Sequence, residues 1–94
     1  MNIQAELSLY PLKTGSLDTA ISRFIDDLAQ ADVVVTRGPM STVVSGENET
    51  LFAAVSRSFE KAALSGEVVL VAKFSNACPA PTPRDQSWSA SSSG

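Results

Sequence analysis

Apolar and polar residues alternate strictly over residues 3–10, which is the period of a strand with one buried face. The apolar members are Ile3, Ala5, Leu7 and Leu9, and the polar members are Gln4, Glu6, Ser8 and Tyr10. Pro11 follows directly and lacks the backbone donor that would continue a sheet ladder. The pattern therefore predicts a strand over residues 2–10 whose polar face carries an acid, a hydroxyl and a phenol in a row.

Two later segments repeat apolar residues at intervals of three and four, the spacing of an amphipathic helix. The first begins after Ser16, a favourable N-cap, and extends to about residue 30. Its apolar stripe is Leu17, Ala20, Ile21, Phe24, Ile25 and Leu28. The second is expected over residues 49–65, with Asn48 as its cap and Gly66 at its end. Its predicted inner positions are Phe52, Val55, Phe59 and either Ala62 or Ala63.

Three more segments predict strands. A β-branched run over residues 33–36 and a returning segment over 41–46 flank a turn with Gly38 and Pro39, which makes them a hairpin. The last strand is predicted over residues 68–75. The resulting order, β-α-β-β-α-β, is that of the ferredoxin-like α+β fold. We expect a four-stranded antiparallel sheet with two helices on one face and the other face open.

The length of 94 residues allows one small domain. Its core is thin, because a chain of this size buries only about 60–70% of its unfolded surface, so association with a second copy would stabilise it. We assign residues 1–79 to the ferredoxin-like domain and residues 80–94, rich in Pro and Ser, to a flexible tail. For Trp88 in that tail, exposure to solvent and docking on an apolar patch both stay open.

Composition narrows the function classes. Seven basic against ten acidic residues leave a formal charge of −3 without a basic patch, so we expect no nucleic-acid partner. Histidine is absent and Cys78 is the one cysteine, which excludes the usual zinc sites, an internal disulfide and catalytic Ser-His-Asp or Cys-His groups. No apolar run approaches the ~20 residues that span a bilayer, and residues 1–4 lack the basic region of a signal peptide. We therefore expect a cytoplasmic binding or assembly module, not an enzyme, with neither metal nor cofactor.

A few polar residues are candidates for binding chemistry. Glu6 is disfavoured in mid-strand, and it either pairs with Lys73 across the sheet or meets a cation or amino group of a ligand. The hydroxyls of Ser41 and Thr42 either satisfy the turn before them or hydrogen-bond a ligand. The acidic pair at residues 26–27 is interpreted as a solvated helix face, since helix neighbours point about 100 degrees apart.

Three short motifs follow one another in the chain. They are Leu7-Ser8-Leu9-Tyr10-Pro11, Ser41-Thr42-Val43-Val44-Ser45-Gly46 and Phe74-Ser75-Asn76-Ala77-Cys78-Pro79, with Leu51-Phe52-Ala53-Ala54 at the start of the second helix. Together they resemble the YkoF-like thiamine/hydroxymethylpyrimidine-binding family over about residues 5–79. The best-known form of that family carries two such domains in one chain. The resemblance thus implies that this single-domain chain forms a homodimer or homotetramer.

The resemblance also implies non-catalytic binding of thiamine or of its hydroxymethylpyrimidine half, serving vitamin uptake or salvage. By position, the residues that match the family's ligand-contacting segments best are Thr42 and Leu9, with Ser41, Ser8 and Tyr10 beside them. Glu6 and Asn76 join the predicted ligand-binding set from their own chemistry. No other partner class, whether nucleic acid or membrane, is expected.

The alternative is a homo-oligomeric interaction module without a small-molecule ligand, because a fold by itself does not specify a ligand. In that case the open face of the sheet would meet a second copy of the chain. The residues expected at this interface are Glu6, Val69, Val71 and Lys73.

Overall fold

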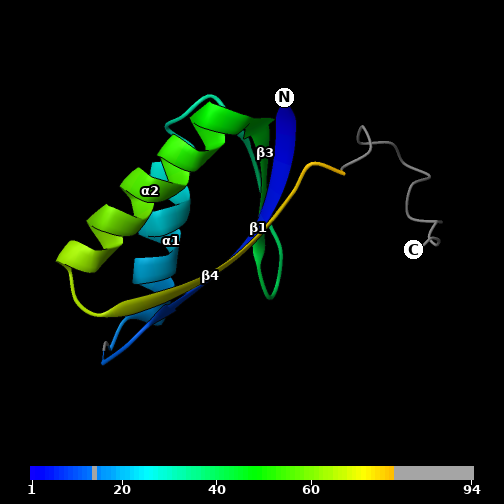
Figure 1. Cartoon of the computed structure of the whole chain (residues 1–94). Helices are drawn as coiled ribbons and strands as arrows, with labels where there is room; N and C mark the ends of the chain where they lie inside the picture. Colours follow the sequence, from blue (N-terminus) through cyan, green and yellow to red (C-terminus); the bar gives the residue numbers. More distant parts are fainter. Residues whose placement is uncertain (14, 78–94) are drawn as a thin grey trace.

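The computed structural model describes residues 1–13 and 15–77, with the β-α-β-β-α-β order that the sequence predicts (Figure 1). Its elements are β1 (Asn2–Pro11), α1 (Leu17–Leu28), β2 (Val34–Arg37), β3 (Thr42–Glu47), α2 (Asn48–Leu64) and β4 (Val68–Ser75). The end of the predicted domain at residues 78–79, Cys78 and the predicted tail with Trp88 lie outside the described residues.

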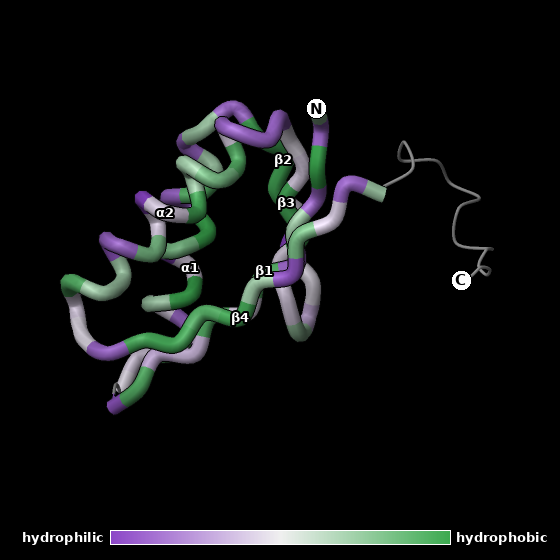
Figure 2. The backbone as a smooth tube through the Cα atoms, viewed as in Figure 1, coloured by the Kyte–Doolittle hydropathy of each residue, from purple (hydrophilic) through white to green (hydrophobic). Residues whose placement is uncertain are grey.

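The four strands form one sheet in the order β2-β3-β1-β4, and every neighbouring pair is antiparallel. Both helices lie against the same face of this sheet (Figure 1). The ferredoxin-like α+β fold is therefore confirmed. Figure 2 shows β4 beginning with an unbroken hydrophobic run, residues 68–72, so this edge strand presents apolar side chains on both of its faces.

The core lies between the sheet and the helices. The alternation of β1 holds, since its inward members are all buried while Gln4, Glu6 and Tyr10 are exposed. The buried apolar residues are Ile3, Ala5, Leu7 and Leu9 of β1, Val44 of β3, Phe24 and Leu28 of α1, and Leu51, Ala54 and Val55 of α2. The open face of the sheet is covered by no described element.

The predicted inner face of α2 is partly wrong. Phe52 and Phe59 are 47% and 38% exposed, and the buried residues of the helix are Leu51, Ala54, Val55 and Ser58. Those buried positions repeat at three and four, so they form the stripe that faces the core. The two phenylalanines are seven residues apart and lie about 100 degrees around the helix from Leu51 and Ser58, which removes them from that stripe.

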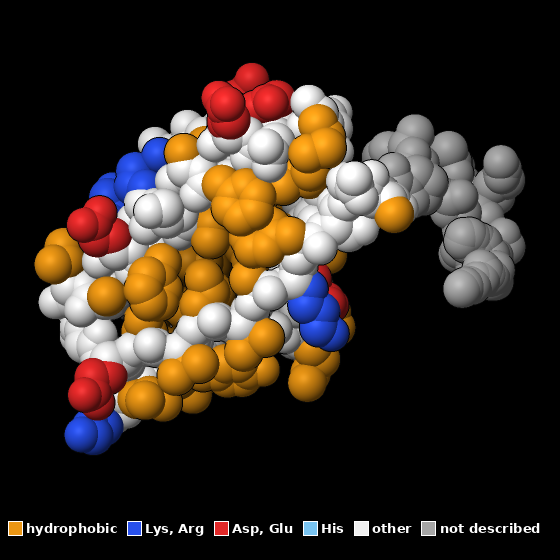
Figure 3. Space-filling view, in the orientation of Figure 1, with side chains coloured by type: hydrophobic (Ala, Val, Ile, Leu, Met, Phe, Trp, Pro, Cys, Tyr) orange, Lys and Arg blue, Asp and Glu red, His pale blue; other side chains and the backbone are white. Residues whose placement is uncertain are grey.

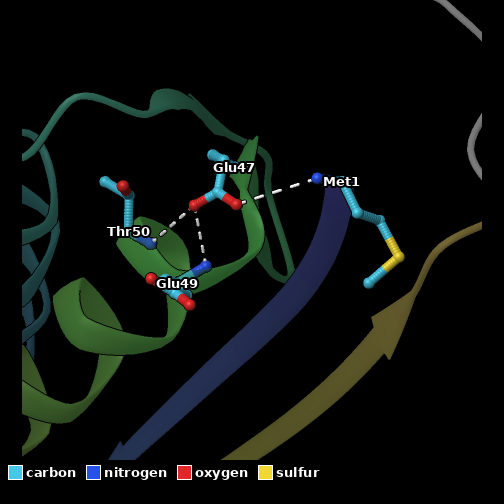
Figure 4. A network of polar contacts seen from close by, with 4 residues as sticks. All are labelled: Met1, Glu47, Glu49 and Thr50. Carbon is cyan, nitrogen blue, oxygen red and sulfur yellow. Dashed lines mark hydrogen bonds and ion pairs between the residues drawn. The ribbon is translucent and has the colours of Figure 1, made fainter.

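The start of α2 is capped by Glu47 and not by Asn48, which is the first helical residue. The Glu47 carboxylate accepts hydrogen bonds through Oε1 from the backbone N–H groups of Glu49, at 2.9 Å, and Thr50, at 3.3 Å (Figure 4). Its Oε2 lies 3.7 Å from the N-terminal ammonium of Met1. Because β3 runs directly into α2, the residue that ends the strand is the one whose side chain reaches the free N–H groups of the first turn.

Ser58 carries the first testable prediction. It is 0% exposed, and its hydroxyl has no hydrogen-bond partner among the described residues. Burying an unpaired hydroxyl costs about 1–3 kcal/mol in mutational data, and alanine is the better helix former. We therefore expect Ser58→Ala to raise the free energy of unfolding by about 1 kcal/mol in urea titrations of the full chain.

The matched control for that prediction is Ser56→Ala, an exposed serine on the same helix. It reports the difference in helix propensity alone, which is a few tenths of a kcal/mol. A decrease in stability for Ser58→Ala would contradict the prediction.

Candidate functional site

The predicted ligand-binding residues occupy three separate places. Glu6, Ser8 and Tyr10 point to the open face of the sheet, as their alternation requires. Leu9 and Thr42 point toward the helices and are 8% and 6% exposed. The predicted set therefore does not form one continuous site.

Asn76 lies apart from both groups. It follows the end of β4, where Ser75 pairs with Gln4, whereas Tyr10 pairs with Val69 near the beginning of β4. Six residues of strand separate the two places, which is about 20 Å. Asn76 and Tyr10 thus cannot contact the same small molecule from these positions.

A polar cluster occupies the centre of the open face, and we call its members Glu6, Ser8, Ser41 and Lys73 the open-face cluster. The Ser41 hydroxyl donates to Oε2 of Glu6 at 2.9 Å. The Lys73 ammonium lies 3.9 Å from Oε1 of the same carboxylate, and the two residues are direct cross-strand partners. Ser8 Oγ donates to the backbone carbonyl of Met40 at 3.5 Å.

This arrangement confirms the cross-strand pair as an explanation of Glu6. Both charged side chains are more than half exposed, so solvent screens the pair and its stabilisation stays below about 1 kcal/mol. With a lysine and a hydroxyl already at its oxygens, Glu6 needs no ligand to account for its place in the strand.

A pocket of about 310 Å³ lies on the other side of the sheet, below the ends of the helices. Pro11, two residues after the buried Leu9 on the inward side of β1, lines one edge of the pocket. Val68 of β4, the cross-strand partner of Pro11, also lines it. The beginning of α1, the end of α2 and the beginning of β4 close it. Its apolar lining is Pro11, Leu12, Ala20, Phe24, Ala62 and Val68. The volume is at the lower end of the range of about 300–1,000 Å³ that holds small molecules.

Charges of both signs line this pocket. Asp27 of α1 lies 3.6 Å from the Lys61 ammonium of α2, and only a quarter of its side chain is exposed. Arg23 and Glu67 also line it, and Glu67 lies 3.6 Å from Lys13. The two acids and two bases of the lining leave it formally neutral. Hydroxyls of Ser16, Thr19 and Ser65 complete the polar part.

Sequence reasoning missed Asp27, which it interpreted as part of a solvated helix face. The signal was present in the helix spacing. Asp27 is three residues after Phe24 and seven after Ala20, so the periodicity puts it at the border of the inner stripe. Its position relative to Lys61 depended on how the two helices pack, which no local pattern shows.

Two absences hold for the part of the chain that the structure describes. No helix there is long and apolar enough to cross a membrane. No group of three or more His, Cys, Asp or Glu residues there is placed to hold a metal ion.

Comparison with known proteins finds one matching family model. The model of the family described as thiamine-binding protein matches residues 5–75, a range that begins in β1 and ends with β4. No curated protein matches the chain.

Several solved structures are similar over nearly their whole length. A hypothetical protein of Methanocaldococcus jannascii is 21% identical with a TM-score of 0.77, covering 95% of this chain and 94% of that chain. A protein of Streptococcus pneumoniae is 22% identical with a TM-score of 0.76, covering 93% and 97%. A candidate thiamine biosynthesis/salvage protein of Thermotoga maritima is 20% identical with a TM-score of 0.76, covering 96% and 98%. At these identities the likeness supports the fold.

Proposed function

The chain belongs to the thiamine-binding protein family, and on this premise we propose that it binds thiamine or its hydroxymethylpyrimidine half without converting it, in the service of vitamin uptake or salvage. The family match carries this proposal, because it spans β1 to β4 and so includes both faces of the sheet and both helices. The description of the Thermotoga maritima neighbour as a candidate thiamine biosynthesis/salvage protein agrees with it.

We place the ligand in the pocket below the helices. This pocket is concave and partly apolar, whereas Glu6 of the open-face cluster already has its partners on an exposed surface. The motif at residues 7–11 supports the same side of the sheet, since Leu9 is the last buried residue of the inward row and Pro11 lines the pocket. Thr42, whose side chain is buried on this side of the sheet but does not line the pocket, stays a prediction of the resemblance.

The lining suits the two halves of thiamine in different ways. A planar aminopyrimidine is held by an apolar wall, which Phe24, at 3% exposed, and Val68 supply at the inner end. Hydroxyls such as that of Thr19 both donate and accept hydrogen bonds, so they can accept from the amino group of the pyrimidine and donate to its ring nitrogens. Glu67 is largely exposed and already lies 3.6 Å from Lys13, and Asp27 is paired with Lys61, so the lining favours the positive thiazolium only weakly.

Calorimetric titration of the full chain tests the function. The protein is first unfolded, freed of any carried-over ligand by dialysis and refolded. We expect saturable binding of thiamine at one molecule per chain, and hydroxymethylpyrimidine is expected to keep a larger share of the affinity than the thiazole half alone, because the inner wall is apolar and the pocket is neutral. No heat and no thermal shift with millimolar thiamine or hydroxymethylpyrimidine would reject the proposed function.

The second candidate function is self-association through the open face. Tyr10, Val69 and Val71 are 52%, 46% and 47% exposed there, and Tyr10 pairs directly with Val69. Contiguous exposed apolar side chains are a feature of interaction surfaces. We propose that two copies pack these faces together as a homodimer, which can pair again into a homotetramer. The two candidates are compatible, since the pocket lies on the opposite side of the sheet.

A further inference from the structure

Three phenylalanines remain exposed on the helix side of the molecule, at the edge formed by β4. We call Phe52 and Phe59 of α2 with Phe74 of β4 the aromatic groove. Their exposed fractions are 47%, 38% and 39%. The rings of Phe52 and Phe74 stack, with centroids 4.3 Å apart and planes 17° from parallel. Figure 3 shows hydrophobic side chains gathered in a hollow between α2 and β4.

The aromatic groove differs from the two surfaces already described. None of its three residues lines the pocket. Phe74 pairs with Ala5, an inward residue of β1, so it points away from the open face. Phe52 and Phe59 lie outside the stripe of α2 that packs into the core. Burial of a large aromatic side chain is strongly stabilising. Covering the groove with an apolar or aromatic segment would therefore be favourable.

We propose that residues 79–88 of the same chain fold back and cover the aromatic groove. The sequence of this segment matches the chemistry of the surface, with Pro79, Pro81 and Pro83 at alternate positions and Trp88 beyond them. Aromatic-lined grooves recognise proline-rich segments, because a polyproline II conformation is already ordered before it docks. Trp88 adds a large ring that gains by burial.

The described chain ends close to the groove. β4 ends at Ser75, directly after Phe74, so the chain leaves the sheet beside the stacked pair. Phe52 and Phe59 are seven residues apart on α2, about 10 Å along the helix axis. From Ala77 to Trp88 the chain advances eleven residues, which span up to about 34 Å in a polyproline II conformation. The segment is thus long enough to turn back and span the groove, with Trp88 within reach of Phe52 and Phe59.

The fluorescence of Trp88 tests this docking, since it is the only tryptophan of the chain. In the native full chain we expect a blue-shifted emission maximum and acrylamide quenching at least about two-fold weaker than in the same chain unfolded in urea. Exchange of Phe52 and Phe59 for serine in one variant should return the quenching to the unfolded level while the far-UV circular dichroism stays native. Leu64→Ser is the matched control, because Leu64 is 83% exposed on the same helix outside the groove. It should leave Trp88 unchanged.

Three outcomes would overturn the proposal. Trp88 quenched in the native chain as strongly as in urea would show that it is not covered. Protection that persists in the groove variant would place it on another surface. Protection that disappears on dilution would assign the groove to the segment of a second copy. Phe74→Ser, measured separately, repeats the test on β4 should the helix variant fail to fold.

Discussion

Replacing Ala62 with tryptophan is expected to abolish thiamine binding. Ala62 is half-buried on α2 and lines the pocket together with Phe24 and Val68. An indole at this position fills space that the pyrimidine is proposed to occupy, and a pocket at the lower end of the usual volume range cannot hold both. We expect the dissociation constant measured by calorimetry to rise at least about 100-fold, which corresponds to about 2.7 kcal/mol.

The neighbouring residue supplies the control for that experiment. Ala63 is exposed, lies on the same helix and does not line the pocket, so Ala63→Trp should bind thiamine like the unmodified chain. Since a larger side chain near the core can cost about 1–3 kcal/mol of stability, thermal unfolding is measured for both variants.

The open-face cluster provides the competing location. Ser41→Ala removes the hydroxyl that donates to Glu6, and Glu6→Gln removes the carboxylate charge. Under the pocket proposal both variants keep the affinity of the unmodified chain. Normal binding by Ala62→Trp together with a loss in Ser41→Ala would move the ligand to the open face while leaving the family function intact.

Val71→Asp is expected to convert a dimer into monomers. Val71 is 47% exposed on the open face, opposite Ser8 in the register of β1 and β4. In a symmetric interface the substitution occurs twice, so two unpaired carboxylates would be buried in apolar contact. The cost of several kcal/mol per buried unpaired charge exceeds what one such interface can absorb. Light scattering at matched concentrations should give the mass of one chain.

The comparison for Val71→Asp is Leu64→Asp, which puts the same charge at an exposed position of α2, away from the open face. It should leave the mass unchanged. An unmodified chain that is monomeric at every concentration tested would reject the interface. Thiamine binding retained by monomeric Val71→Asp would show that each chain holds a complete pocket.

Much of the fold follows from the sequence because it depends on local spacing. The alternation of residues 3–10 correctly predicted which side chains of β1 are buried, and the bounds of β4 agree with the prediction, 68–75. The cross-strand contact between Glu6 and Lys73 followed from placing both on the open face of neighbouring strands. Each of these inferences needs only the geometry of one strand or one pair.

The sequence predicted the buried face and the N-cap of α2 less well, because both depend on how neighbouring elements pack against the helix. The apolar pattern of α2 offered a stripe with Phe52 and Phe59, while the packed helix buries Leu51, Ala54, Val55 and Ser58. The N-cap of α2 is Glu47 and not the predicted Asn48, because β3 ends and α2 begins without a loop between them. Both outcomes depend on neighbouring elements and not on the helix alone.

By itself the sequence determined the order of elements, the inward and outward sides of the strands and the resemblance to thiamine-binding proteins, since period and motif are properties of contiguous residues. Only the tertiary structure brought the Ser41 hydroxyl against the Glu6 carboxylate on the open face, because these residues are 35 positions apart in the chain and meet only when β1 and β3 pair. It alone also assembled the pocket, because Pro11, Phe24, Ala62 and Val68 come from four elements that meet only when the chain is packed.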